Sequence, residues 1–130
     1  MQLDNYLGII VDHSLKNQEY ARQMQILASR SIGSWRLLLV MVEEGKLAEQ
    51  IQSLQENMVD IQDKCWYAHF FRQQELIIVY QDRMFRITVQ PDTWGEAIQY
   101  GLANGIPEEQ LDFQPCFKSE ALALFQVTND

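Results

Sequence analysis

Residues 65–89, CWYAHFFRQQELIIVYQDRMFRITV, determine the predicted fold because they contain three consecutive strand patterns. The first, residues 65–72, is rich in aromatic side chains, which pack well on a pleated surface. The second, residues 76–80, is a short apolar run with several β-branched side chains. In the third, residues 84–90, apolar and polar side chains alternate, as in a strand with one buried face. Short polar breaks separate the patterns, so the three strands are predicted to be antiparallel neighbours.

The sequence before this unit predicts a hairpin followed by a helix. Residues 23–31 and 34–42 are expected to pair around a turn at Gly33. An amphipathic helix over residues 46–62 is indicated by apolar residues at helical steps, namely Leu47, Ile51, Leu54, Met58 and Ile61. A strand–helix–strand connection of this length suits a parallel placement of the second hairpin strand and residues 65–72, with the helix on one face of the sheet.

A second helix is predicted after the three strands, over residues 93–104. Thr93 and Glu96 have the spacing of a capping box, in which each side chain satisfies a main-chain N–H group of the other residue. Gly105 stands where a helix end favours a left-handed residue, and Pro107 prevents the helix from continuing.

The two ends of the chain leave alternatives open. In residues 3–22 the apolar side chains have helical spacing, and a helix is the preferred interpretation, although Gly8–Val11 also suits an extended segment. The tail, residues 117–130, is unusually apolar for a chain end. It is expected either to dock as a short helix or to pack on a neighbouring chain. Residues 1–116 are expected to form a single domain.

Together these elements predict an α+β fold, in the form of a two-layer α/β sandwich. Its sheet is expected to be mainly antiparallel with five strands, in the order strand, strand, helix, strand, strand, strand, helix. Both helices, residues 46–62 and 93–104, are expected to cover the same face. The other face is then left to meet a ligand or a partner.

Composition limits the classes of partner. The chain has 130 residues and a formal net charge of −8. Nucleic acids and anionic membranes are bound largely through Lys and Arg, so this charge argues against both. No apolar run approaches the roughly 18–20 residues that span a bilayer, and the start lacks the features of a signal peptide, so a cytoplasmic location is expected. Cys65 and Cys116 are expected to be free thiols.

Several motifs occur together along the chain: WYAHF at residues 66–70, FRI at residues 85–87 and GIPEEQLDF at residues 105–113. With the opening DNYLGIIV at residues 4–11, they resemble a family of small bacterial and archaeal cytosolic proteins of unknown function. The resemblance covers most of residues 4–113 and leaves out the tail. No activity is assigned to that family, so the resemblance implies one compact domain and transfers no catalytic residue.

Arginine residues gather in and beside the predicted strands, whereas acidic residues concentrate in the helices and at their ends. Arginine beside aromatic rings can bind planar anions or an acidic partner surface. The candidate ligand-binding residues on this basis are Arg36, Trp66, Phe70, Arg72 and Arg86. The alternative interpretation is that the arginines are solvated and keep the sheet from pairing at its edges.

His69 and Asp112 are the candidate residues of a polar site. His69 could act as a general acid or base, but a strand histidine that is hydrogen-bonded to a neighbour is the simpler interpretation. The sequence contains no phosphate-binding loop, zinc motif or nucleophile motif, and two histidines cannot form a multi-histidine metal site. We therefore predict no catalytic residue, no metal and no cofactor.

The sequence leaves three classes of function open. The preferred one is a non-enzymatic regulatory or interaction module that self-associates as a homodimer or larger. Its basis is a sheet that is too apolar for one layer of helices, together with the apolar tail. The second is a small-anion-binding domain that uses the arginine-bearing face. The third is an enzyme that depends on His69, and it ranks last because no activated nucleophile is visible.

Overall fold

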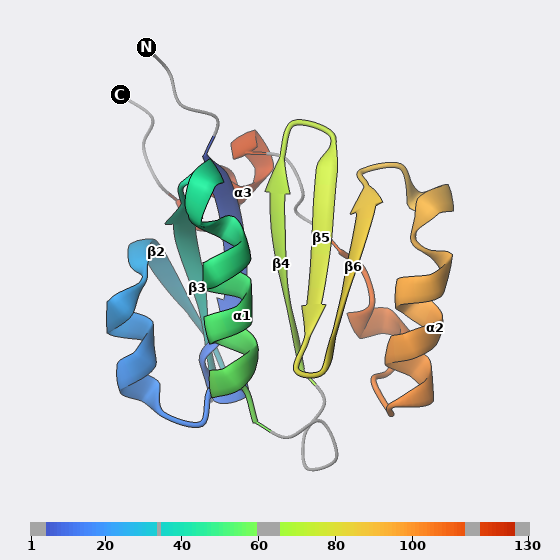
Figure 1. The fold of residues 1–130 in the computed structure, drawn as a ribbon, viewed down its shortest axis with the longest axis horizontal. Helices are drawn as coiled ribbons and strands as arrows, with labels where there is room; N and C mark the ends of the chain where they lie inside the picture. The colour runs from blue at the N-terminus through green and yellow to red at the C-terminus, as the bar shows by residue number, and fades with distance from the viewer. Residues whose placement is uncertain (1–4, 34, 60–65, 114–117, 127–130) are drawn as a thin grey trace.

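The structure, a computed structural model, describes residues 5–33, 35–59, 66–113 and 118–126. Its centre is one six-stranded sheet with the strand order β2-β3-β1-β4-β5-β6 (Figure 1). All neighbouring strands are antiparallel. The strands are β1 (Tyr6–Val11), β2 (Gln25–Ile32), β3 (Trp35–Val42), β4 (Tyr67–Arg72), β5 (Glu75–Tyr80) and β6 (Arg83–Thr88).

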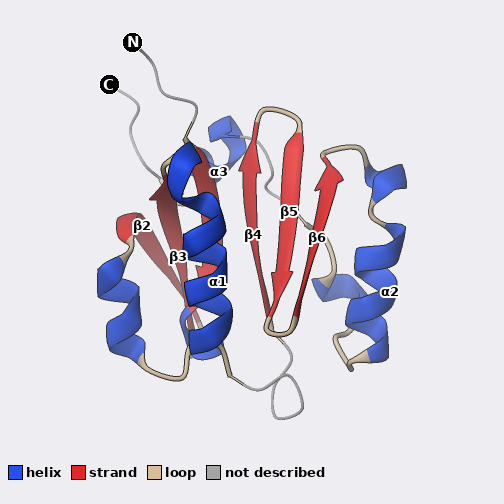
Figure 2. Cartoon of the chain, viewed as in Figure 1, coloured by secondary structure: helices blue, strands red, loops and turns tan. Residues whose placement is uncertain are grey.

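Within the described residues, three α-helices and several short 3₁₀ turns connect and cover these strands (Figure 2). The α-helices are α1 (Leu47–Asn57), α2 (Gly95–Ala103) and α3 (Lys118–Leu124). The 3₁₀ turns are η1 (Asp12–Ser14), η2 (Gln18–Gln23), η3 (Glu44–Lys46), η4 (Pro91–Thr93) and η5 (Glu108–Gln110).

The α+β class and the antiparallel sheet are confirmed, including both predicted hairpin units. β2 pairs with β3, and β4, β5 and β6 form the predicted three-stranded unit. The turn between β4 and β5 places Gln73 at a φ of 55°, and the pair Arg72–Glu75 closes it. The apolar and polar patterns of the sequence therefore predicted five of the six described strands and three of the strand pairs.

The preference for a helix at the N-terminal end was wrong, and this adds a sixth strand. Tyr6–Val11 is a strand with all six residues buried, and it lies between β3 and β4. Its apolar side chains face both cores of the protein, so a run that also fits helical spacing is used as a central strand. Consequently β3 and β4 run in the same direction, as the crossover predicted, but β1 separates them.

The expectation that both helices cover one face was also wrong. α1 packs with η2 on one face, in a core that contains Leu47, Ile51 and Leu54. α2 and α3 pack on the opposite face, in a second core that contains Ala97 and Ala121. In Figure 1, α1 crosses the near side of the sheet, whereas α3 lies behind it.

The physical reason for two covered faces lies in β5. Leu76, Ile78 and Tyr80 enter the α2 core, whereas Ile77 and Val79 enter the α1 core, and all five are at most 1% exposed. A central strand that is apolar on both faces needs a layer on each face to remove it from water. The sheet of this protein therefore has no uncovered broad face among the described residues.

The two ends of α2 differ in how well the sequence predicted them. Gly105 has a φ of 95°, its N–H donates to Leu102 O, and the Ile106 N–H donates to Gly101 O at 3.0 Å, which is the predicted left-handed helix end. The predicted capping box is absent, because the helix begins after Trp94, which makes no side-chain cap. Thr93 instead hydrogen-bonds to Thr88 of β6.

The described part of the tail packs on its own chain. α3 contributes Ala121 to the α2 core, and Phe125, just after the helix, is 7% exposed in the same core. Arg30 of β2 donates to the carbonyl oxygen of Leu124 at 2.9 Å. These contacts lie within one chain, and the choice between docking on the domain and packing on a neighbouring chain stays a prediction.

Candidate functional site

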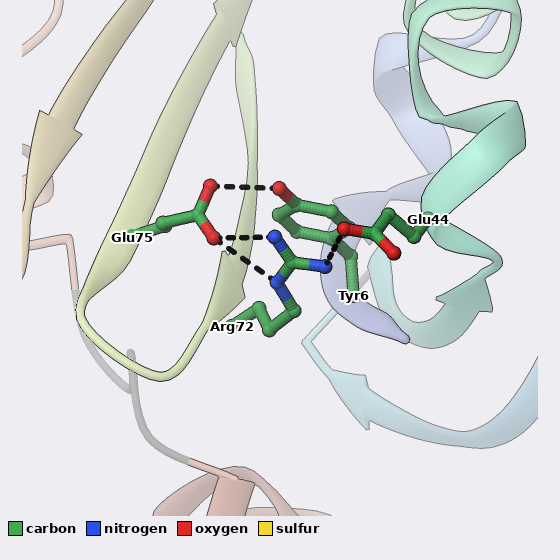
Figure 3. A network of polar contacts seen from close by, with 4 residues as sticks. All are labelled: Tyr6, Glu44, Arg72 and Glu75. Carbon is green, nitrogen blue, oxygen red and sulfur yellow. Dashed lines mark hydrogen bonds and ion pairs between the residues drawn. The ribbon is translucent and has the colours of Figure 1, made fainter. Parts of the chain in front are cut away.

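A network of four polar residues forms at one end of the central strands. Tyr6 begins β1, Arg72 ends β4, Glu75 begins β5, and Glu44 lies in η3 (Figure 3). The sheet register brings the first three together, because Arg72 pairs with Glu75 and the pair Leu7–Phe71 lies beside them. These side chains all point to the α1 face, on which Glu44 approaches from outside the sheet.

Arg72 is held on several sides at once. Its guanidinium donates to Glu75 Oε2 from Nη2 at 2.6 Å and from Nε at 3.0 Å. Its Nη1 lies 2.8 Å from an oxygen of Glu44, and its Cζ lies 4.3 Å from the ring centre of Tyr6. The Tyr6 hydroxyl donates to the other oxygen of Glu75 at 2.7 Å (Figure 3). The network therefore ties β1, β4, β5 and η3 together.

The network shifts the titration of its members in opposite directions. The hydrogen bond from Tyr6, followed by those from Arg72, lowers the pKa of Glu75. Burial, followed by the hydrogen bond to Glu75, raises the pKa of Tyr6. The hydrogen bonds to Glu75 and Glu44 raise the pKa of Arg72, which stays charged. The native state thus fixes an ionised Glu75 beside a neutral Tyr6.

This arrangement speaks for a structural role of Arg72. Its donors already serve two carboxylates, and a ligand anion would have to displace one of them. Glu75 keeps 41% of its side chain exposed, so solvent screens the pair and limits its contribution to stability.

The five candidate ligand-binding residues do not converge on one site. Phe70 is fully buried in the α1 core, and Trp66 is half-buried just before β4. Arg36 and Arg86 are exposed but stand on β3 and β6, which are four strand positions apart in the sheet, or roughly 19 Å at the usual strand spacing. Arg72 is in the network described above.

The candidate polar site also has its members in different surroundings. His69 is 5% exposed and faces the α2 core, with ring centres of Tyr67 and Phe71 at 6.4 and 5.7 Å. Asp112 is exposed after η5. The pKa of Tyr67 is raised first by the burial of its own ring and second by the negative charge of Asp112. The Tyr67 hydroxyl donates to Gln110 O at 2.5 Å. A buried histidine among aromatic rings is poorly placed to exchange protons with a substrate.

Open grooves flank β6 on both of its faces. One, between α1 and β6, has Ile51 and Gln55 on the helix side and Met84 and Arg86 on the strand side. The others lie between β6 and α2 and share Phe85. The guanidinium of Arg83 lies 4.7 Å from the Phe85 ring centre, against an aromatic surface of its own chain. Arg83 and Arg86 thus place two positive charges along this edge strand.

The two edges of the sheet differ in how they are protected. At β6, the Thr88 N–H donates to Thr93 Oγ1 at 3.2 Å, and the Thr88 carbonyl accepts from the Trp94 indole at 2.8 Å. At β2, the side chains of Ile26 and Leu27 are each 40% exposed, and the register shifts at this point through a bulge. An unpaired strand edge with exposed apolar side chains is a surface that can pair with another strand.

Sequence reasoning found the strand at residues 23–31 but did not identify it as an edge. The composition of the strand could have shown that it is an edge. QILASRSI (Gln25–Ile32) is the more polar strand of the hairpin, and its apolar and polar side chains alternate only loosely. A central strand such as WRLLLVMV, Trp35–Val42, is apolar on both sides.

Among the described residues, no group of three or more His, Cys, Asp or Glu side chains is arranged to hold a metal ion. None of the described helices has both the length and the apolar character that a bilayer crossing requires. Cys65 and Cys116, the predicted free thiols, lie outside the described residues.

Comparison with known proteins finds no matching family model, no matching curated protein and no matching solved structure. The resemblance of WYAHF and GIPEEQLDF to a family of unknown function therefore stays a prediction. What the chain does has to be inferred from its own geometry.

Proposed function

We propose that this protein is a non-enzymatic interaction module that self-associates through the open edge of its sheet. The observation that supports the proposal is the difference between the two edges. β6 carries Arg83 and Arg86 and has the main-chain groups of Thr88 satisfied by Thr93 and Trp94. β2 exposes Ile26 and Leu27 and has no described strand beyond it.

The basis for self-association differs from the one that the sequence suggested. The sequence suggested a sheet with one uncovered apolar face, but α1 and α2 cover opposite faces of the sheet. The surface that we propose for a partner is therefore the β2 edge. Strand addition there would pair main-chain N–H and C=O groups that face away from β3, where no described strand lies, and would bury the two apolar side chains.

An interaction role also agrees with the state of the candidate chemical groups. His69 is enclosed by the α2 core, and Arg72 is bound by its own carboxylates. Neither side chain offers an unsatisfied reactive group in a cavity, which an enzyme or an anion site would need. No observation on the described residues favours a second candidate function.

The experiment that tests the proposal is light scattering coupled to size exclusion, from about 1 to 100 µM protein. We expect a dimer or larger species that dissociates on dilution. Leu27→Lys places a charge on the β2 edge and should shift the protein towards the monomer by tenfold or more in dissociation constant.

The matched control is Met84→Lys on the other edge strand. Met84 is 37% exposed, close to the 40% of Leu27, so the two substitutions change a similar surface in the same chemical way. Met84→Lys should leave self-association unchanged. A wild-type protein that stays monomeric at 100 µM would remove the support for the proposal.

A further inference from the structure

We infer that the strand added at this edge is β2 of a second copy, in antiparallel orientation and with Ser29 opposite Ser29. This inference rests on the proposed function and specifies its partner. The result is a closed dimer in which two six-stranded sheets continue into one another across a two-fold axis.

The charge of the segment favours a second copy. Residues 21–42 contain Arg22, Arg30 and Arg36 and no carboxylate, although the chain has 18 acidic residues and a net charge of −8. Two acidic molecules repel each other over most of their surface. They can approach most closely where carboxylates are missing, and β2 lies in that segment.

A head-to-tail contact between β2 and β6 is disfavoured by the same charges. It would bring Arg30 of one copy towards Arg83 and Arg86 of the other, and it would have to displace Thr93 and Trp94 from Thr88. Such a contact also leaves a free β2 edge at one end, so it does not close. In two-fold pairing, the β2 edge of each copy pairs with the β2 edge of the other, so neither β2 edge stays open.

The hairpin register determines which main-chain groups face the second copy. Ile32 and Trp35 close the hairpin with two residues between them, so they form a pair of the hydrogen-bonded kind. The kinds alternate along the ladder, so Arg30 also directs its N–H and C=O towards β3. Ser29 and Ser31 direct theirs to the open side.

Among the two-fold registers that pair these outward groups, one brings the exposed Leu27 against the second copy. With Ser29 opposite Ser29, Leu27 lies opposite the second copy's Ser31, where the bulge ends the regular ladder. Arg30 then lies opposite Ala28, and the two Arg30 side chains are diagonal neighbours, roughly 7–8 Å apart, rather than directly opposed. Each Arg30 is already turned to its own Leu124 carbonyl at 2.9 Å.

The other two registers are worse. Pairing Ser29 with Ser31 sets Arg30 directly opposite Arg30, which is destabilising for like charges. Pairing Ser31 with Ser31 leaves Ile26 and Leu27 in water. The bulge between Ile26 and Ala28 shortens the regular ladder, so the pairing is centred on Ala28–Arg30 and ends on each side with Leu27 opposite Ser31.

The test is disulfide trapping in a protein whose Cys65 and Cys116 are replaced by serine. Ser29→Cys should form a covalent dimer under mild oxidation with glutathione disulfide, because directly opposed residues have Cα atoms about 5.5 Å apart, within disulfide reach. Ser31→Cys should crosslink at least fivefold less, because its two copies are offset by four residues, roughly 13 Å. Met84→Cys, on β6, should behave like Ser31→Cys.

Light scattering on the same serine-replaced protein, without the added cysteine, separates the two levels of the proposal. A dimer in which Ser29→Cys crosslinks no faster than Ser31→Cys or Met84→Cys overturns the β2 pairing and leaves self-association in place. A monomer at 100 µM overturns both. A dimer that crosslinks fastest at Ser29→Cys, and that Leu27→Lys dissociates, supports both.

Discussion

Gly8 and Phe70 are directly opposed in β1 and β4, and the Phe70 ring occupies the space that a side chain at position 8 would need. A Cβ atom built on Gly8 would lie 2.4 Å from two ring carbons of Phe70. Phe70 is fully buried under α1, so the ring cannot move outward without opening the core. The glycine is therefore required by packing and not by a turn.

Gly8→Ala should destabilise the protein by about 1–3 kcal/mol, as overpacking of a well-filled core does. The measurement is the urea midpoint of unfolding, at constant slope. Gly45→Ala is the control, because Gly45 is exposed and has no atom within 4 Å of a built Cβ. Adding Phe70→Leu to Gly8→Ala should cost less than the sum of the two single changes. Additive costs would contradict the contact.

Glu75 should make the stability of the protein depend on pH under acidic conditions. Its pKa is lowered in the native state, so its ionised form contributes stability above the ordinary carboxyl pKa, and this contribution is lost as pH falls through the native value. Since the side chain is 41% exposed, we expect at most about 1 kcal/mol.

Glu75→Gln should therefore reduce the fall in unfolding free energy between about pH 5 and pH 3, measured by urea titration at each pH. Glu43→Gln is the matched control, because among the described residues Glu43 pairs with Lys46 in an exposed salt bridge at 3.6 Å. An unchanged pH profile in Glu75→Gln would show that Tyr6 and Arg72 do not hold this carboxylate.

The sequence predicted the strands whose patterns are local and left out what depends on distant partners. β4, β5 and β6 are joined by short turns, so their pairing follows from adjacent residues. Read alone, the segment of β1 favoured a helix, although it also suited an extended strand. Its strand form is decided by β3 and β4, which lie more than 20 residues away in the chain.

The network around Arg72 could not be read from the sequence for a related reason. Arg72 and Glu75 are three residues apart and face each other across a turn, which the sequence could have suggested. Glu44 and Tyr6 come from η3 and β1, and they turn a candidate anion-binding arginine into a member of a structural network. An arginine on a strand can be assigned to a ligand only once its carboxylate neighbours are known.

Gly105 should be sensitive to substitution because of its backbone conformation. Its φ of 95° is one that side chains with a Cβ rarely adopt, although no atom lies within 4 Å of a built Cβ. Gly105→Ala should cost about 1–2 kcal/mol through strain alone. Gly95→Ala, at the first residue of the same helix, should be neutral or stabilising. Equal urea midpoints for the two variants would contradict the strained helix end.

The last prediction concerns the docking of the tail on its own chain. Phe125 is 7% exposed in the core that also contains Trp94 and Phe113, so Phe125→Ala should cost about 3–5 kcal/mol if the neighbours do not relax. Ala123→Ser, on an exposed position of α3, is the control and should cost less than 1 kcal/mol.

The dependence on protein concentration distinguishes docking in one chain from docking on a neighbour. If α3 packs on its own chain, the difference in unfolding midpoint between wild type and Phe125→Ala stays constant from about 1 to 50 µM. Making both proteins in the Leu27→Lys background removes the contribution of self-association at β2. A difference that shrinks at low concentration in that background would mean that Phe125 is buried by a second chain.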